Sequence, residues 1–187
     1  MAVTELDART ALVLVDLQKG IVGMPTVHAM DGVVKNARAL AAAFRRRGLP
    51  VVLVNVAGGA PGRAEQTRGL GALPDGWTDL VPELDRQPSD HVVTKRTWGA
   101  FTNTDLDEHL KGRGVTQIAL AGVSTSAGVE STARHAVELG FNVTLASDAM
   151  TDMNLDAHTN SLMRIFPRLG ETGTTREIID LLEHTRA

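Results

Sequence analysis

Short apolar runs alternate along the chain with longer stretches in which apolar residues recur at helical spacing. Residues 11–15 read Ala-Leu-Val-Leu-Val without interruption, and residues 51–56 and 117–121 form similar runs. Such runs are typical of strands that are buried on both faces of a parallel sheet, where neither side meets water. Shorter runs predict further strands at 91–94 and 142–146.

Helical spacing fills the stretches between these strands. From residue 33 to residue 47, apolar side chains recur every three or four positions, and three arginines followed by Gly48 mark the helix end. The same spacing predicts helices at 104–111, 128–139, 156–166 and 175–183, with a short edge strand near Glu171. Because strands and helices alternate, we predict a three-layer α/β/α sandwich around a mainly parallel, Rossmann-like sheet of about six strands.

Residues 57–90 interrupt this alternation. Glycines and prolines punctuate this segment, which has little periodicity and is typical of a functional loop or a packing arm. No linker, repeat or low-complexity tract divides the chain elsewhere. We therefore expect the 187 residues, of which 43% are hydrophobic, to form one domain spanning residues 1–187.

Composition and charge exclude several classes of protein. A formal net charge of -3 and a pI near 6.1 argue against nucleic-acid and membrane-surface partners, for which a basic excess is expected. The first residues lack a basic and then apolar stretch, so we expect no secretory leader, and no apolar run approaches the roughly 18 residues that span a bilayer. The absence of cysteine excludes disulfides, thiolate metal sites and thiol nucleophiles. We expect a soluble, cytoplasmic protein.

Polar residues that could carry chemistry stand at the ends of three predicted strands. Asp16 ends the first strand, Lys95 ends the third, and residues 122–128 link the fourth to a helix. In open α/β sheets, ligands bind beyond the carboxyl ends of the strands, so these groups are expected to share a pocket. Considered alone, such an Asp is more often a turn former and such a Lys a solvated residue.

Three motifs, in order along the chain, resemble those of the isochorismatase-like superfamily, most of whose members are cysteine hydrolases. Residues 14–18 are similar to its first-strand motif, residues 94–106 to its lysine motif and residues 122–134 to its nucleophile loop. The resemblance covers nearly the whole chain. It implies that Asp16 and Lys95 are catalytic and that the pocket also contains Gln18 and Asn55.

The same resemblance gives the nucleophile loop a definite geometry. It implies a cis peptide bond between Val123 and Ser124, which directs the N–H groups of Ser124 and Gly128 toward one oxyanion. Thr125 and Ser126, which follow in this loop, are expected to contact the substrate.

Other features set limits on the pocket. Trp98 and Phe101 follow Lys95 and are expected to form pocket walls, although core packing explains them equally well. Nicotinamidases of the superfamily bind a metal after the second strand, whereas residues 55–60 here contain no histidine. We therefore expect neither a metal nor another cofactor.

Gly128 occupies the position of the superfamily's nucleophilic cysteine, so thioester chemistry is not available. A serine nucleophile would need a base, and His135 is expected to be a packing residue. Isochorismatases of the same superfamily also carry glycine here and retain the Asp and the Lys. They hydrolyse a vinyl ether without a covalent intermediate: the Asp protonates the methylene carbon, and water captures the oxocarbenium ion.

The resulting hypothesis is a hydrolase that acts on a small, carboxylated substrate through a vinyl ether or a related bond. Asp16 would be the general acid, so burial must raise its pKa against the lowering effect of a Lys95 ammonium. The alternatives are a catalytically silent relative that binds a small metabolite and an amidohydrolase that uses no cysteine. Because the superfamily commonly assembles, a homo-oligomer is expected.

Overall fold

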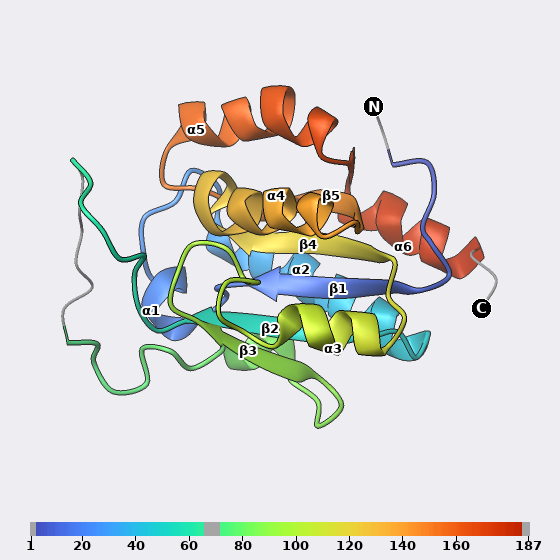
Figure 1. Cartoon of the computed structure of the whole chain (residues 1–187), viewed down its shortest axis with the longest axis horizontal. Coiled ribbons are helices and arrows are strands. Elements are labelled where there is room, and N and C mark those ends of the chain that lie inside the picture. The colour runs from blue at the N-terminus through green and yellow to red at the C-terminus, as the bar shows by residue number, and fades with distance from the viewer. Residues whose placement is uncertain (1–2, 66–71, 185–187) are drawn as a thin grey trace.

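A computed structural model describes residues 3–65 and 72–184, and a six-stranded parallel sheet forms its centre (Figure 1). The strand order is β3-β2-β1-β4-β5-β6, and each strand of this sheet pairs with its neighbours in parallel. The strands are β1 (Thr10–Val15), β2 (Val51–Val56), β3 (His91–Lys95), β4 (Gln117–Val123), β5 (Asn142–Thr151) and β6 (Glu171–Gly173). The predicted α/β sandwich with a six-stranded parallel sheet is thus confirmed.

Helices cover both faces of this sheet (Figure 1). They are α1 (Lys19–Val22), α2 (Met30–Arg46), α3 (Leu106–Gly112), α4 (Glu130–Glu138), α5 (Leu155–Asn160) and α6 (Thr175–His184). Shorter helical turns are η1 (Pro82–Leu84), η2 (Thr125–Val129), η3 (Ser161–Ile165) and η4 (Phe166–Arg168). The helices α2 and α6 pack on one face, and α3, α4 and the turns after α5 pack on the other.

The fully buried strand β1 separates two apolar cores. Leu12 and Leu14 point into the core beneath α2, and Ala11, Val13 and Val15 point into the core beneath α3 and α4. Alternate side chains of a strand face opposite sides of the sheet, so a strand covered on both sides needs an uninterrupted apolar run.

The structure differs from the predicted boundaries chiefly around β4 and β5. The strand β5 was expected to end at residue 146 but continues to Thr151. Leu120 pairs with Leu145, and Gly122 pairs with Met150. The chain therefore moves five positions along β5 for two positions along β4, so β5 contains a bulge here. The polar residues of this bulge interrupt the apolar run, so the pattern did not reveal the strand's second half. The helix predicted from residue 128 begins earlier, as the wider turn η2.

The described parts of residues 57–90 are irregular, as predicted, apart from the short turn η1. Their second half packs against the chain that leaves β1: Gln18 forms an antiparallel bridge with Leu80, and the Val81 N–H donates to the Leu17 carbonyl at 3.1 Å. Residues 66–71 of this segment lie outside the described residues. No helix among the described residues is long and apolar enough to cross a membrane.

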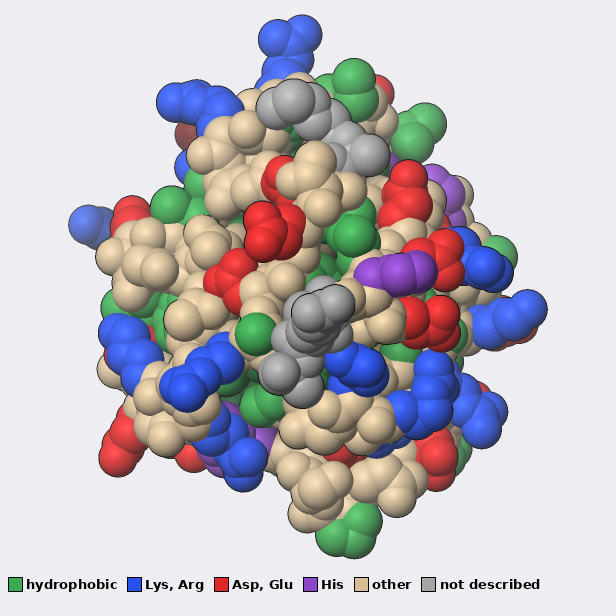
Figure 2. Space-filling model, turned by 90° about the vertical axis from the view of Figure 1, so that its right-hand side faces the viewer, with side chains coloured by type: hydrophobic (Ala, Val, Ile, Leu, Met, Phe, Trp, Pro, Cys, Tyr) green, Lys and Arg blue, Asp and Glu red, His purple; other side chains and the backbone are tan. Residues whose placement is uncertain are grey.

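Basic and acidic side chains are interspersed over the face that holds the amino ends of the strands (Figure 2). This is the face opposite the carboxyl ends of the strands, where Asp16 and Lys95 lie.

Candidate active site

Asp16 and Lys95 form an ion pair at the carboxyl ends of the strands. Asp16 follows β1 directly, Lys95 is the last residue of β3, and β2 lies between these strands. The Lys95 Nζ lies 2.8 Å from Asp16 Oδ2 and donates a further hydrogen bond to the Thr97 carbonyl at 3.1 Å. Their side chains are only 2% and 8% exposed, for Lys95 and Asp16 respectively. The two charges therefore face each other in a place that little solvent reaches.

A cavity of about 200 Å³ opens beside this pair. Its polar end holds Asp16, Lys95 and Ser124, and its apolar walls include Trp98 and Met153. The remaining lining residues are Ile21, Val56, Gly58, Gly59, Thr97, Val123, Ala127 and Gly128. Among the described residues, no three His, Cys, Asp or Glu side chains are grouped as ligands of a metal ion would be.

Burial dominates the electrostatics of Asp16. It raises the pKa of this carboxyl from the ordinary value of 3.8 to about 6, although the charge and the hydrogen bond of Lys95 lower it. The second carboxyl oxygen, Oδ1, is buried and has no hydrogen-bond partner among the described residues. A buried carboxylate oxygen without a donor is costly, so this oxygen favours the neutral form of Asp16.

The chain after β4 brings its backbone against Asp16. Gly122 has a φ of 123°, and a Cβ at this position would lie 2.0 Å from the Val15 carbonyl oxygen, so only glycine lets β4 pass β1 here. The peptide bond between Val123 and Ser124 is cis, as the resemblance implied. A Cβ on Gly128 would lie 3.2 Å from Asp16 Oδ2. Residue 128 is therefore a direct neighbour of the carboxylate.

Five of the residues named from sequence line the cavity: Asp16, Lys95, Trp98, Ser124 and Gly128. The structure brings these groups together from β1, β3 and the chain segments after β3 and β4, as the strand-end argument predicts.

Gln18 and Asn55 do not line this cavity. The amide of Gln18 is fully buried and exchanges hydrogen bonds with the Val56 backbone, donating to its carbonyl at 3.0 Å and accepting from its N–H at 2.7 Å. The amide of Asn55 donates to the Thr78 carbonyl at 2.9 Å. Both amides hold neighbouring chain segments in place.

Phe101, Thr125 and Ser126 also lie outside the cavity lining. Phe101 packs in the core, with its ring centroid 5.9 Å from that of Phe141 and 5.4 Å from that of His135. Phe101 is therefore a core residue and not a wall of the cavity, and His135 packs against its ring. The hydroxyl of Thr125 lies 2.8 Å from His158 Nδ1. Ser126 is bound by Asp152, through contacts described below.

The apolar lining residues that the sequence reasoning missed include Ile21 and Met153. Ile21 lies in α1, which is too short to give a periodic signal, and Met153 follows the half of β5 that was not predicted. Asp152 was missed as well, because it directly follows the half of β5 that the pattern did not reveal.

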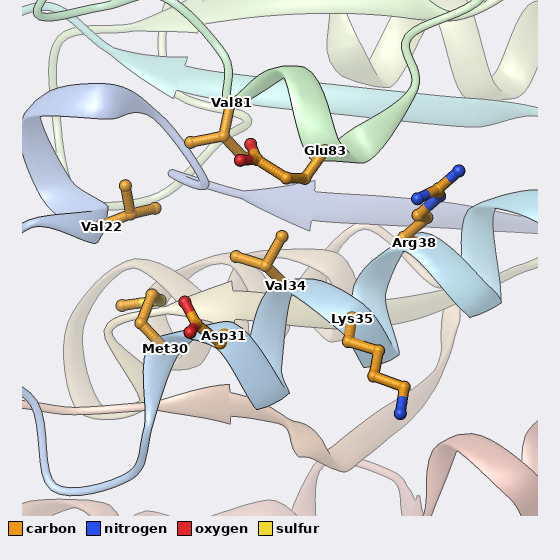
Figure 3. A pocket seen from close by; sticks show the side chains of 8 residues that line it. All are labelled: Val22, Met30, Asp31, Val34, Lys35, Arg38, Val81 and Glu83. Atoms are coloured by element: carbon orange, nitrogen blue, oxygen red, sulfur yellow. The ribbon is translucent and has the colours of Figure 1, made fainter.

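A larger cavity, of about 460 Å³, lies between α2 and η1 (Figure 3). Val34 forms part of its floor, and Asp31, Lys35, Arg38 and Glu83 stand around it. Neither Asp16 nor Lys95 contributes to it. The smaller cavity is the candidate active site, because Asp16, the acid with the raised pKa, lines it together with Lys95.

Comparison with known proteins relates the chain to one family. The isochorismatase domain profile matches residues 10–177. YwoC, an uncharacterized isochorismatase family protein of Bacillus subtilis (strain 168), is 43% identical over 179 residues, which cover 92% of this chain and 93% of that protein. An isochorismatase family protein from Burkholderia thailandensis has a structure that matches with a TM-score of 0.92 and 42% identity, covering 96% of this chain and 98% of that one. The ureidoacrylate amidohydrolase RutB of Variovorax paradoxus (strain S110) is 28% identical over 174 residues, 77% of this chain and 69% of that protein.

Proposed function

Because the chain belongs to the isochorismatase family, whose members are hydrolases, we propose that it hydrolyses a small molecule without a covalent intermediate and that Asp16 is the general acid. The sequence contains no cysteine. The turn after β4 carries Gly128 at the place where the resemblance puts the nucleophile. Water would therefore attack the substrate directly.

The environment of Asp16 is the observation that carries this proposal. A carboxyl with a pKa of about 6 is protonated in about half of the molecules at pH 6 and in about a tenth at pH 7, far more than an ordinary Asp, and a general acid must be protonated. Its Oδ2 is paired with Lys95, and its Oδ1 has no partner among the described residues. The neutral Asp16 carboxyl would transfer its proton to a substrate in the cavity that it lines.

In a vinyl ether, the Asp16 proton would go to the methylene carbon and leave an oxocarbenium ion. Water would add to this ion and return a proton to the Asp16 carboxylate, and the hemiketal would then collapse to a carbonyl compound and an alcohol. Lys95, 2.8 Å from Asp16 Oδ2, would stabilise the carboxylate between the two proton transfers.

The polar end of the cavity favours a carboxylated substrate. Lys95 supplies a positive charge, and the N–H groups of Ser124 and Gly128, at a turn that leads into a helix, would supply donors to a carboxylate or an oxyanion. A cavity of about 200 Å³ limits the substrate to a small molecule.

The test is turnover of isochorismate, a carboxylated vinyl ether, followed as release of pyruvate. We expect release by the wild type and a loss of about 100-fold or more in kcat/KM for Asp16→Asn, because general acid catalysis contributes factors of this size. The control is Asp31→Asn, since Asp31 is exposed on α2 and does not line this cavity. Full turnover by Asp16→Asn would exclude the acid role. Binding by the wild type without turnover would favour a catalytically silent relative.

A second candidate, an amidohydrolase, draws support from the relationship to RutB and from the position of residue 128. A Cβ there would lie 3.0 Å from Val15 Cγ1, so Gly128→Cys requires shifts of a few tenths of an ångström. We expect its thiol, beside Asp16 and Lys95, to react with iodoacetamide faster than the exposed thiol of a Thr159→Cys control. Equal rates would show that the pocket does not activate a thiol. Amide hydrolysis by the wild type would favour the amidohydrolase.

A further inference from the structure

A second buried carboxylate, that of Asp152, holds the turn that lines the cavity. Asp152 follows β5 directly and is 4% exposed. Its Oδ2 accepts hydrogen bonds from both the N–H and the hydroxyl of Ser126, each at 2.8 Å. Its Oδ1 accepts from the N–H groups of Met153 at 2.8 Å and Asn154 at 3.2 Å. Four donors thus converge on one carboxylate, and hydrogen bonds to a charged acceptor are the stronger kind.

The bulge in β5 brings Asp152 to this place. Beyond the bulge, Met150 and Thr151 pair with Gly122 and Val123, so both strands end side by side. Asp152 then stands next to the turn η2, at the same edge of the sheet as Asp16.

The turn held by Asp152 also encloses Asp16. Ser126 lies between Ser124 and Gly128, which both line the cavity. A Cβ on Gly128 would lie 3.2 Å from Asp16 Oδ2 and 3.2 Å from the Val123 carbonyl oxygen, so the backbone of this turn lies against the carboxylate. Outward movement of the turn would admit water to Asp16.

We propose that Asp152 is a positioning residue: by binding Ser126, it fixes the turn after β4 against Asp16 and keeps water from the Asp16 carboxyl. Its importance for catalysis rests on the proposed function, in which Asp16 is the acid. Its effect on the environment of Asp16 does not depend on any substrate.

The chain contains a matched control for this contact. Asp148, which lies within β5, accepts hydrogen bonds from the N–H and the hydroxyl of Thr175, at 2.6 and 2.8 Å. This contact anchors the start of α6, and neither residue lines the cavity beside Asp16. A change at Asp148 therefore removes the same kind of contact from a place where it cannot move the turn η2.

The experiment is a titration of the Asp16 carboxyl by ¹³C NMR in the full chain, with the Asp16 signal assigned from Asp16→Asn. In Asp152→Asn, the loss of the negative charge weakens the hydrogen bonds that Ser126 donates even where the amide oxygen still faces Ser126, and both are lost where the amide nitrogen faces it. We expect the pKa of Asp16 to fall by about one unit, because water would reduce the effect of burial. Lys95 is the one other charged side chain among the described cavity-lining residues, so its charge is the main remaining influence. In Asp148→Asn, the Asp16 titration should be unchanged.

Ser126→Ala provides a second variant in case Asp152→Asn does not fold. It removes the hydroxyl contact but keeps the N–H contact, so the pKa of Asp16 should fall by less and in the same direction. An unchanged Asp16 titration in the folded variants of Asp152 and Ser126 would overturn the proposal. So would an equal shift in Asp148→Asn. Absence of turnover by the wild type would contradict the proposed function, but it would not change what the titration shows about Asp152 and the Asp16 carboxyl.

Discussion

The side chain of Asp16 experiences two opposing effects, and their balance decides what it can do. The Lys95 ammonium favours the carboxylate, whereas burial favours the neutral acid and has the larger effect on the pKa. The ion pair alone would have suggested a permanently charged Asp. The protein thus has a carboxyl that changes its charge near pH 6, and this property belongs to one residue and its immediate neighbours.

The pH dependence of stability follows from this shift. The pKa of Asp16 is about 6 in the folded chain and 3.8 by ordinary reference, so the folded state binds the extra proton between these values. The contribution of Asp16 to the free energy of unfolding is therefore fully present below pH 3.8. It decreases as the pH rises and is lost above pH 6, which lowers the free energy of unfolding by about 3 kcal/mol. Urea unfolding of the wild type and Asp16→Asn, from pH 4 to 7, measures the difference. A difference that does not change with pH would contradict the shift.

At the scale of elements, the site depends on how closely β4 approaches β1. Their pairing runs from Thr10–Gln117 to Val15–Gly122, and at its last step the backbone of Gly122 crosses against Val15. A side chain at this point would push apart the two strands whose ends carry Asp16 and Ser124. The candidate site therefore depends on a contact between two backbones.

We expect Gly122→Ala to lower the free energy of unfolding by several kcal/mol, because the Cβ would lie 2.0 Å from the Val15 carbonyl oxygen. Gly140→Ala is the control, since Gly140 also has a positive φ, of 89°, but nothing lies within 4 Å of its Cβ position. Backbone strain alone should then cost about 1 kcal/mol. Urea unfolding followed by circular dichroism measures both values, and equal losses would refute the steric argument.

At the scale of the whole molecule, ion pairs connect the irregular segment to the sandwich. Asp90, just before β3, is bound by Arg45 of α2 through Nε at 3.1 Å and Nη2 at 2.6 Å. This carboxylate is nearly buried, whereas the pair of Lys19 and Asp79, in the same part of the molecule, is more than half exposed. The buried pair fixes where the chain returns to the sheet.

Replacing Asp90 should therefore lower the free energy of unfolding much more than replacing Asp79. We expect Asp90→Ala to lower the free energy of unfolding by about 3 kcal/mol, because Arg45 loses the partner of a largely buried charge. Asp79→Ala should cost less than about 1 kcal/mol, since solvent screens an exposed pair. Thermal unfolding of both variants makes the comparison, and similar losses would contradict it.

The sequence by itself determined the sheet and the meeting of Asp16 with Lys95. An apolar run such as residues 11–15 has one way to be buried on both sides, and the carboxyl ends of parallel strands lie at one edge. Only the tertiary structure decided which polar side chains face the cavity. Thr125 and Ser126 bind His158 and Asp152, partners about thirty positions away, which no local pattern contains. The pKa of Asp16 could not be predicted from the sequence for the same reason. It depends on how completely segments that are distant along the chain exclude water from this carboxyl.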